Sequence, residues 1–253
     1  MRDDLRVVAA LAIAVSFAGC EHIYGPTSPS REWTTHESAR YVLYTRPGSF
    51  AESNAAALAE VLEDQYTHTI ATLRIAPGAR ISMFLYNSGS ELDPPLPSAR
   101  AGVAFPETNA VHAVSFAPLD NDLRALLTHE ANHVIVQNGL GRAGTSFMNE
   151  GLASALISER FAEIGPAFLR RWVRTNRSRV PPLVDLIDDD KWSSHSNEGY
   201  RASAAFLAFL LEEYGADRLK QIYHAPSADF AGRLRDSYGR SLAELEAAWL
   251  ARD

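Results

Sequence analysis

The sequence LLTHEANHVIVQNG at residues 126–139 decides the fold, because it is an apolar helix that contains three titratable side chains. His129, Glu130 and His133 stand where a buried helix would carry leucine. Residues i and i+4 lie on one face of a helix, so both imidazoles can point at a single divalent metal ion. Glu130 is offset around the helix and can reach a metal-bound water instead. We therefore expect a zinc site on this helix.

A site with only two histidines would be open, so a third protein ligand is expected. The downstream segment FMNEGLASALISE places Glu150 in the first turn of an apolar helix that Ser146 can cap. Taken alone, a first-turn glutamate favours the helix dipole and needs no other role. Taken with His129 and His133, it is the natural third ligand.

HEANH at residues 129–133 and NEGLA at residues 149–153 together resemble the signature of the gluzincin zinc metallopeptidases. The likeness is greatest to the compact bacterial peptidase MA-like domains, in which a βαβ segment and a hairpin precede the motif helix. Residues 200–215 match a further pattern of that family. The resemblance extends over residues 38–251, and its specific part is residues 126–153.

The resemblance implies a role for each polar residue of the two motifs. It implies three ligands for one zinc ion, namely His129, His133 and Glu150. Glu130 would be the general base that takes a proton from the attacking water and delivers it to the leaving amine. Asn149 and Gly151 would shape the turn that presents the third ligand.

The sequence departs from the family pattern in two places. The interval between His133 and Glu150 is short for this clan. Four residues after Glu150, where thermolysin-like enzymes have an aspartate that orients a ligand histidine, this chain has Ser154. We expect another group, such as the backbone or Glu159, to orient the imidazole.

Hydrolysis also needs a donor for the tetrahedral oxyanion, which gluzincins take from a Tyr or His in the helical half. Tyr200 is the first candidate and His195 the second. Each also has a structural interpretation, Tyr200 as a packing residue and His195 as a solvated loop residue. An extended peptide would bind along a sheet edge beside the motif helix, at residues 102–105 or 110–116.

The order of the predicted elements indicates an α+β fold. Residues 40–45 alternate and are rich in aromatic and β-branched residues, which predicts a strand. Strands are also predicted at residues 80–86, 102–105 and 110–116. Helical periodicity predicts helices at residues 53–73, 123–138, 146–164, 167–177, 199–214, 218–223 and 242–251. Asn121 or Asp122 is the expected cap of the motif helix, and Gly139 its expected end. The resemblance implies a zincin-like arrangement, in which the βαβ unit and hairpin pack on the motif helix before a mostly helical C-terminal half.

Residues 1–19 are typical of a secretory signal peptide, because their apolar run is shorter than the about 20 residues that a membrane-spanning helix needs. The run ends at Cys20, the only cysteine, in a context that resembles a bacterial lipobox. We expect Cys20 to be lipidated and residues 20–35 to form a tether rich in Gly, Pro and Ser. An incidental cysteine after an ordinary signal peptide is the alternative. Residues 36–253 would then form an exported domain, anchored to a membrane of the bacterial cell envelope.

Composition argues for an ordinary globular domain, since 46% of the 253 residues are hydrophobic and 22% are charged. The net charge of −7 gives no electrostatic reason to expect nucleic acid as a partner. A local basic run is interpreted as a solvated helix face, with an anionic surface as the alternative. Its members are Arg170, Arg171, Arg174, Arg177 and Arg179.

The leading hypothesis is a zinc-dependent peptidase of the cell envelope that acts on a peptide or protein substrate. One alternative is a binding or assembly module that keeps its zinc without catalysis, although a purely structural zinc site would not need Glu130. Another is a hydrolase that uses the same chemistry on a non-peptide substrate. An aminopeptidase would also need an acidic anchor for the substrate amine, for which Glu198 is conceivable.

Overall fold

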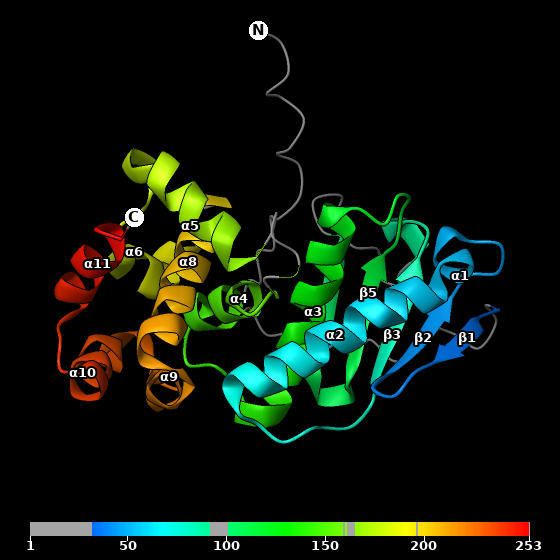
Figure 1. The fold of residues 1–253 in the computed structure, drawn as a ribbon, viewed down its shortest axis with the longest axis horizontal. Helices are drawn as coiled ribbons and strands as arrows, with labels where there is room; N and C mark the ends of the chain where they lie inside the picture. Colours follow the sequence, from blue (N-terminus) through cyan, green and yellow to red (C-terminus); the bar gives the residue numbers. More distant parts are fainter. Residues whose placement is uncertain (1–31, 92–100, 159, 161–164, 196, 253) are drawn as a thin grey trace, which may run out of the picture.

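The computed structural model describes residues 32–91, 101–158, 160, 165–195 and 197–252. A sheet with two long helices forms one half of the molecule, and a group of helices forms the other (Figure 1). The strands are β1 (Thr34–Glu37), β2 (Tyr41–Thr45), β3 (Ile81–Tyr86), β4 (Gly102–Phe105) and β5 (Ala110–Val114). The helices are α1 (Phe50–Ser53), α2 (Ala55–Leu73), α3 (Asn121–Leu140), α4 (Ser146–Ala155), α5 (Pro166–Thr175), α6 (Leu183–Ile187), α7 (Asp189–Trp192), α8 (Asn197–Tyr214), α9 (Ala216–Ile222), α10 (Ser227–Tyr238) and α11 (Leu242–Leu250).

The sheet has the strand order β1-β2-β3-β5-β4. β2, β3 and β5 are parallel, whereas β1 and β4 pair antiparallel at the two edges. The expected βαβ unit is β2–α2–β3, and the expected hairpin is the β4–β5 pair. Of the two segments that could have offered a free edge, β4 is the edge strand and β5 lies inside the sheet. The mixed α+β layout with a mostly helical second half is therefore confirmed.

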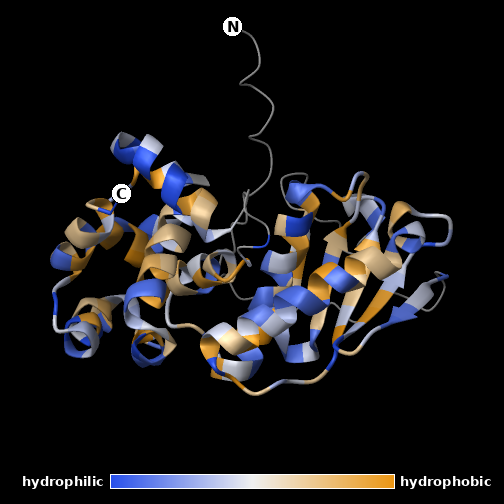
Figure 2. Ribbon diagram, viewed as in Figure 1, coloured by the Kyte–Doolittle hydropathy of each residue, from blue (hydrophilic) through white to orange (hydrophobic). Residues whose placement is uncertain are grey.

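Successive side chains on the strands point to opposite faces of the sheet. Leu43 and Met83 stand opposite each other in register and are fully buried in the core beneath α2 and α3, which lie on one face (Figure 1). On the other face, Tyr44 stacks on Phe84 with ring centroids 4.5 Å apart, and Phe84 stacks on His112 at 4.7 Å. Hydrophobic residues dominate the inner strands β3 and β5, while the edge strand β1 and the outward turns of α2 are hydrophilic (Figure 2).

Helix α3 begins at Asn121, two residues before the expected start at residue 123. Asp120, rather than Asn121 or Asp122, is the N-cap, and its carboxylate accepts a hydrogen bond from the backbone N–H of Leu123 at 3.1 Å. A carboxylate at this position satisfies a backbone donor that has no partner inside the helix.

The expected end of α3 at Gly139 is wrong, because the helix continues to Leu140 and Gly141 follows it with φ +84°. Gly139 serves a different purpose. A Cβ at this position would lie 2.4 Å from Cδ1 of Ile75, so a glycine is required where the chain after α2 crosses α3.

Helix α4 also differs from the expectation at both ends. Thr145, rather than Ser146, is its N-cap and accepts a hydrogen bond from the N–H of Met148 at 3.1 Å. The helix ends at Ala155 instead of continuing to residue 164. Of the predicted extension, only residues 156–158 and 160 fall within the described part of the chain.

The early end of α4 has a tertiary cause. The side chain of Gln65 on α2 donates to the carbonyl oxygen of Leu156 at 2.7 Å and accepts from the N–H of Ser158 at 3.1 Å. These hydrogen bonds fix the backbone that follows α4 outside the helix. They cannot be predicted from a local sequence pattern, because Gln65 is far from α4 in the sequence.

Helix α8 is the centre of the second half, where it packs against α4 and α5 in one hydrophobic core. The segments that sequence periodicity did not identify are β1, α1, α6, α7 and α10. Most are short, and β1 is largely exposed, so they carry little apolar periodicity. β1 begins at Thr34, inside the range expected to be a tether, and Cys20 lies outside the described residues. Among the described helices, none is both long and apolar enough to cross a membrane.

Candidate metal centre

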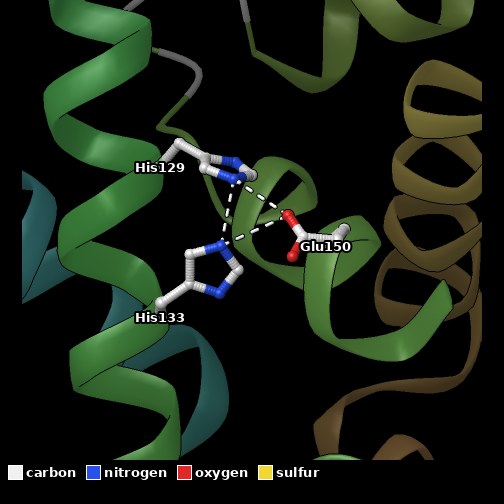
Figure 3. A group of neighbouring side chains, drawn as sticks. All are labelled: His129, His133 and Glu150. Carbon is white, nitrogen blue, oxygen red and sulfur yellow. Dashed lines mark hydrogen bonds and ion pairs between the residues drawn. The ribbon is translucent and has the colours of Figure 1, made fainter. Parts of the chain in front are cut away.

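The two histidines of the motif lie on the face of α3 that meets α4. Both are buried, His129 completely, and their rings approach edge to face (Figure 3). The two Nε2 atoms are 3.0 Å apart. The i, i+4 spacing on a buried helix therefore directs both imidazoles at one point, as the sequence predicted.

Glu150 reaches the same point from α4. Its Oε2 atom lies 3.3 Å from Nε2 of His129 and 3.4 Å from Nε2 of His133 (Figure 3). Asn149, the preceding residue, donates from Nδ2 to Oε1 of Glu150 at 3.0 Å, which orients the carboxylate. Glu150 is 1% exposed, so the acid is held away from bulk water.

The three atoms have the spacing that a tetrahedral metal ion requires. Nitrogen and oxygen ligands at about 2.0–2.1 Å from zinc lie about 3.3 Å from one another in a tetrahedron. The observed separations of 3.0, 3.3 and 3.4 Å match that value. Two imidazoles and one carboxylate are also the ligand set of a catalytic zinc site that keeps a fourth position open. The residues present therefore fit one zinc ion.

The cluster is electrostatically coupled. Burial disfavours the charged form of His133, but the carboxylates of Glu150 and Glu130 and hydrogen bonds with Glu150 and Asn149 raise its pKa to about 9. Burial also acts to raise the pKa of Glu150, yet the two imidazoles outweigh it and lower that pKa well below its usual range. In the metal-free protein, these shifts favour a protonated His133 beside an ionised Glu150.

Glu130 lies beside the ligands and against the edge strand. It is 1% exposed, and its side chain lies beside Gly102 at the start of β4. A Cβ on Gly102 would lie 3.0 Å from Cγ and 3.2 Å from Oε1 of Glu130. Gly102 therefore allows the edge strand to pass directly over the carboxyl group. The sequence did not single out this glycine, because it is 28 residues away from Glu130 in the chain.

The residue that orients His129 is Ser154 itself. Its Oγ lies 2.9 Å from Nδ1 of His129, and both side chains are buried. The expectation that the backbone or Glu159 takes this role is therefore wrong for the backbone, while Glu159 lies outside the described residues. A hydroxyl fills the position because it accepts the ring N–H that His129 has when Nε2 binds a metal.

The roles expected for Asn149 and Gly151 need one correction. Both lie within helix α4 rather than in a turn. A Cβ on Gly151 would lie 2.9 Å from Cδ1 of Leu207 and 2.9 Å from Cβ of Ser203, both on α8. Gly151 thus permits the close approach of α8 to α4, and the presentation of Glu150 depends on helix packing.

The two candidate oxyanion donors lie in the second half. Tyr200 is buried on α8, with its ring 5.2 Å from that of Trp192. His195 is half-buried in the segment before α8, with its Cβ 2.8 Å from the position of a Cβ on Gly199. Neither belongs to the His129, His133 and Glu150 cluster, and their catalytic roles remain predictions.

Some of the charged residues discussed outside the cluster form ion pairs near the surface. Glu198, the conceivable amine anchor, forms an ion pair with Arg179. Arg170 pairs with Glu212 on α8, and the five arginines of the basic run are exposed. Such exposed pairs contribute little to stability.

Comparison with known proteins extends the description of the fold. No protein-family model and no curated protein matches the sequence. The structure is similar to that of native leukotriene A4 hydrolase from Saccharomyces cerevisiae, with a TM-score of 0.52 and 14% sequence identity. The match covers 87% of this chain and 39% of that chain, so this chain spans about two fifths of its length. At this identity the similarity concerns the fold.

Proposed function

We propose that this chain is a zinc-dependent peptidase. The observation that carries the proposal is the convergence of His129, His133 and Glu150 at tetrahedral spacing beside the buried Glu130. The similarity in fold to a solved structure that is named as a hydrolase supports the broader class of metallohydrolases.

The residues of the site would have separate roles in hydrolysis. His129, His133 and Glu150 would hold zinc, which supplies a Lewis acid and lowers the pKa of a bound water toward 7. Glu130 accepts a proton from the attacking water and returns it to the leaving amine. Asn149 and Ser154 keep the Glu150 carboxylate and the His129 ring in position.

The edge strand β4 is the proposed platform for an extended peptide. It begins at Gly102, against Glu130, and pairs on one side with β5. A peptide that adds to its other side would run past the general base. Tyr200 or His195 would donate to the oxyanion that forms when the peptide carbonyl is attacked.

The proposed location is the bacterial cell envelope. This part of the proposal rests on the sequence before the described residues, in which Cys20 follows a short apolar run. Lipidation of Cys20 would anchor the domain to a membrane through residues 20–35.

A second candidate belongs to the same class of metallohydrolases. The compared structure is named after leukotriene A4, which is not a peptide, so a non-peptide substrate is the alternative. The same cluster and the same Glu130 would serve both reactions.

Metal content tests the proposal most directly. The purified full chain, dialysed against metal-free buffer and resupplied with one equivalent of zinc, should retain about one zinc ion per chain by elemental mass spectrometry. Glu150→Ala should lose most of it. Glu107→Ala is the matched control, because Glu107 contacts the far end of α3 through Gln137. A folded parent that retains no zinc would contradict the proposal.

A further inference from the structure

A buried polar network joins the two helices that carry the candidate ligands. Gln65 and Thr69 on α2 and Asn132 on α3 are completely buried. The Oδ1 atom of Asn132 accepts from Oγ1 of Thr69 at 2.7 Å and from Nε2 of Gln65 at 3.1 Å. Burying three such side chains is costly unless each finds partners, and here each does.

Asn132 extends this network to α4. Its Nδ2 atom donates to the carbonyl oxygen of Ala153 at 2.7 Å. Asn132 precedes His133 in α3, and Ala153 precedes Ser154 in α4. The bond therefore crosses the α3–α4 interface within one residue of a candidate ligand on one side and of the His129 partner on the other.

Gln65 holds the end of α4. Its Nε2 atom donates to the carbonyl oxygen of Leu156 at 2.7 Å, and its Oε1 atom accepts from the N–H of Ser158 at 3.1 Å. Asn132 and Gln65 thus fix α4 at two points, one beside the cluster and one at the helix terminus.

Apolar side chains could fill the same space, but they would not fix the position of α4 along its axis. Packed hydrophobic surfaces tolerate small slides, whereas hydrogen bonds to single carbonyl oxygens are directional. The separations of 3.0–3.4 Å between the three ligand atoms depend on that position. A slide of α4 along its axis by a fraction of an ångström would move Glu150 and Ser154 together relative to His129 and His133 on α3.

We propose that Asn132, with Gln65 and Thr69, is a positioning device that sets the register between α3 and α4 and so preorganises the metal centre. The part of this inference that concerns the metal rests on the proposed function. The part that concerns the register of the two helices applies to the metal-free protein as well. Asn132 contacts no reacting atom and acts through His129, His133 and Glu150.

The test compares three substitutions within the network. Asn132→Leu removes every hydrogen bond of this side chain at similar volume. Asn132→Asp keeps the acceptor toward Thr69 and Gln65 but loses the donor to Ala153. Thr69→Val removes the hydroxyl that donates to Asn132 and accepts from Gln65, and it keeps the shape of the side chain. It serves as the mildest variant if the others fail to fold. Leu219→Ala is the control, because Leu219 is fully buried on α9 and lies outside the polar network. Its truncation should make the protein less stable without removing a hydrogen bond of the network.

Two measurements on the full chain decide the matter. Zinc affinity from competition with a chromophoric chelator, together with the visible spectrum of the cobalt-loaded protein, reports ligand geometry. We expect Asn132→Leu and Asn132→Asp to bind zinc at least about tenfold more weakly, with an altered cobalt spectrum. Leu219→Ala should keep the parental affinity and spectrum. Parental affinity and spectrum in a folded Asn132→Leu variant would overturn the inference.

The second measurement needs no metal. In the metal-free protein, Nδ1 of His129 lies 2.9 Å from Oγ of Ser154 across the α3–α4 interface, and nuclear magnetic resonance detects the proton of this hydrogen bond when it is protected from exchange. We expect this signal in the parent and in Leu219→Ala, and its loss in Asn132→Leu. Retention in Asn132→Leu would overturn the inference. If the parent shows the signal but binds no zinc, the proposed function is refuted. The proposal on the register of α3 and α4 is then decided by the presence or absence of this signal in Asn132→Leu.

Discussion

Nδ1 of His129 on α3 and Oγ of Ser154 on α4 lie 2.9 Å apart, so a hydrogen bond joins the two helices that meet at the candidate metal centre. Ser154 stands four residues after Glu150, one turn along the same helix. Helix α4 therefore supplies both the candidate acidic ligand and the group that orients an imidazole ligand. A neutral hydroxyl in this position polarises the ring less than a carboxylate would.

Ser154→Ala should weaken zinc binding by about 10–100-fold, because His129 loses the partner that fixes its orientation. Ser154→Asp should restore or exceed the parental affinity, since a carboxylate accepts the same ring N–H more strongly. Chelator competition measures both. Ser203→Ala is the control, because Ser203 is a buried serine whose hydroxyl donates to the backbone of Tyr200. Equal affinities for the parent and Ser154→Ala would show that the hydrogen bond is dispensable.

Glu130→Gln should abolish peptide hydrolysis while zinc content stays near one ion per chain. The amide keeps the shape of the side chain but cannot accept the proton, and loss of a general base costs about 10²–10⁴-fold in rate. Turnover of a fluorogenic peptide library, with metal content measured on the same sample, provides the comparison. A variant as active as the parent would remove Glu130 from the mechanism, and a binding module would show no peptide turnover in either protein.

Gly102→Ala should reduce activity and stability together. The added methyl would lie 3.0 Å from Cγ of Glu130 and 3.1 Å from Cδ1 of Leu126, so the carboxyl or the strand must shift. Overpacking of this kind costs about 1–3 kcal/mol in the free energy of unfolding. Zinc content should not change, because no ligand is touched.

Gly232→Ala is the matched substitution on α10, where a Cβ meets no atom within 4 Å. It should leave activity unchanged and raise the free energy of unfolding by about 0.5–1 kcal/mol, the helix preference of alanine over glycine. Chemical denaturation measures both variants. An equally stable and active Gly102→Ala protein would show that the contact between β4 and Glu130 is loose.

Zinc binding should become tighter as the pH rises. Since the pKa of His133 is about 9 in the metal-free protein, the ring is protonated at neutral pH and the proton must leave when zinc binds. The affinity should therefore rise about tenfold per pH unit and level off above about pH 9. Calorimetry at pH 7 in buffers of different ionisation enthalpy should show about one proton released per zinc ion. Binding without proton release would contradict the coupling between His133 and Glu150.

The same shift makes a prediction for stability. The pKa of His133 is raised from 6.5 to about 9, so its contribution is complete below pH 6.5 and is lost as the pH rises through about 9. The metal-free protein should lose stability over this range. The zinc-loaded protein should not, because its His133 carries no proton to lose.

The sequence alone determined the local parts of the site and the outline of the fold. His129 and His133 share a face because the α-helix repeats every 3.6 residues, and this relationship needs no tertiary contact. Alternation with a period of two likewise located β2, and short apolar segments bounded by turn residues located β3, β4 and β5. Glu150 was recognised through a resemblance between short motifs, which extends beyond local periodicity.

Only the tertiary structure decided which groups support these residues. Gln65 is 67 residues from Asn132, Gly102 is 28 residues from Glu130, and Ser154 is 25 residues from His129. Such pairs form because the two hydrophobic cores bring α2, α3, α4 and β4 together. A periodic sequence pattern does not predict these contacts. Local spacing and a second short motif thus predicted the candidate ligands, while long-range packing chose the side chains that hold them in place.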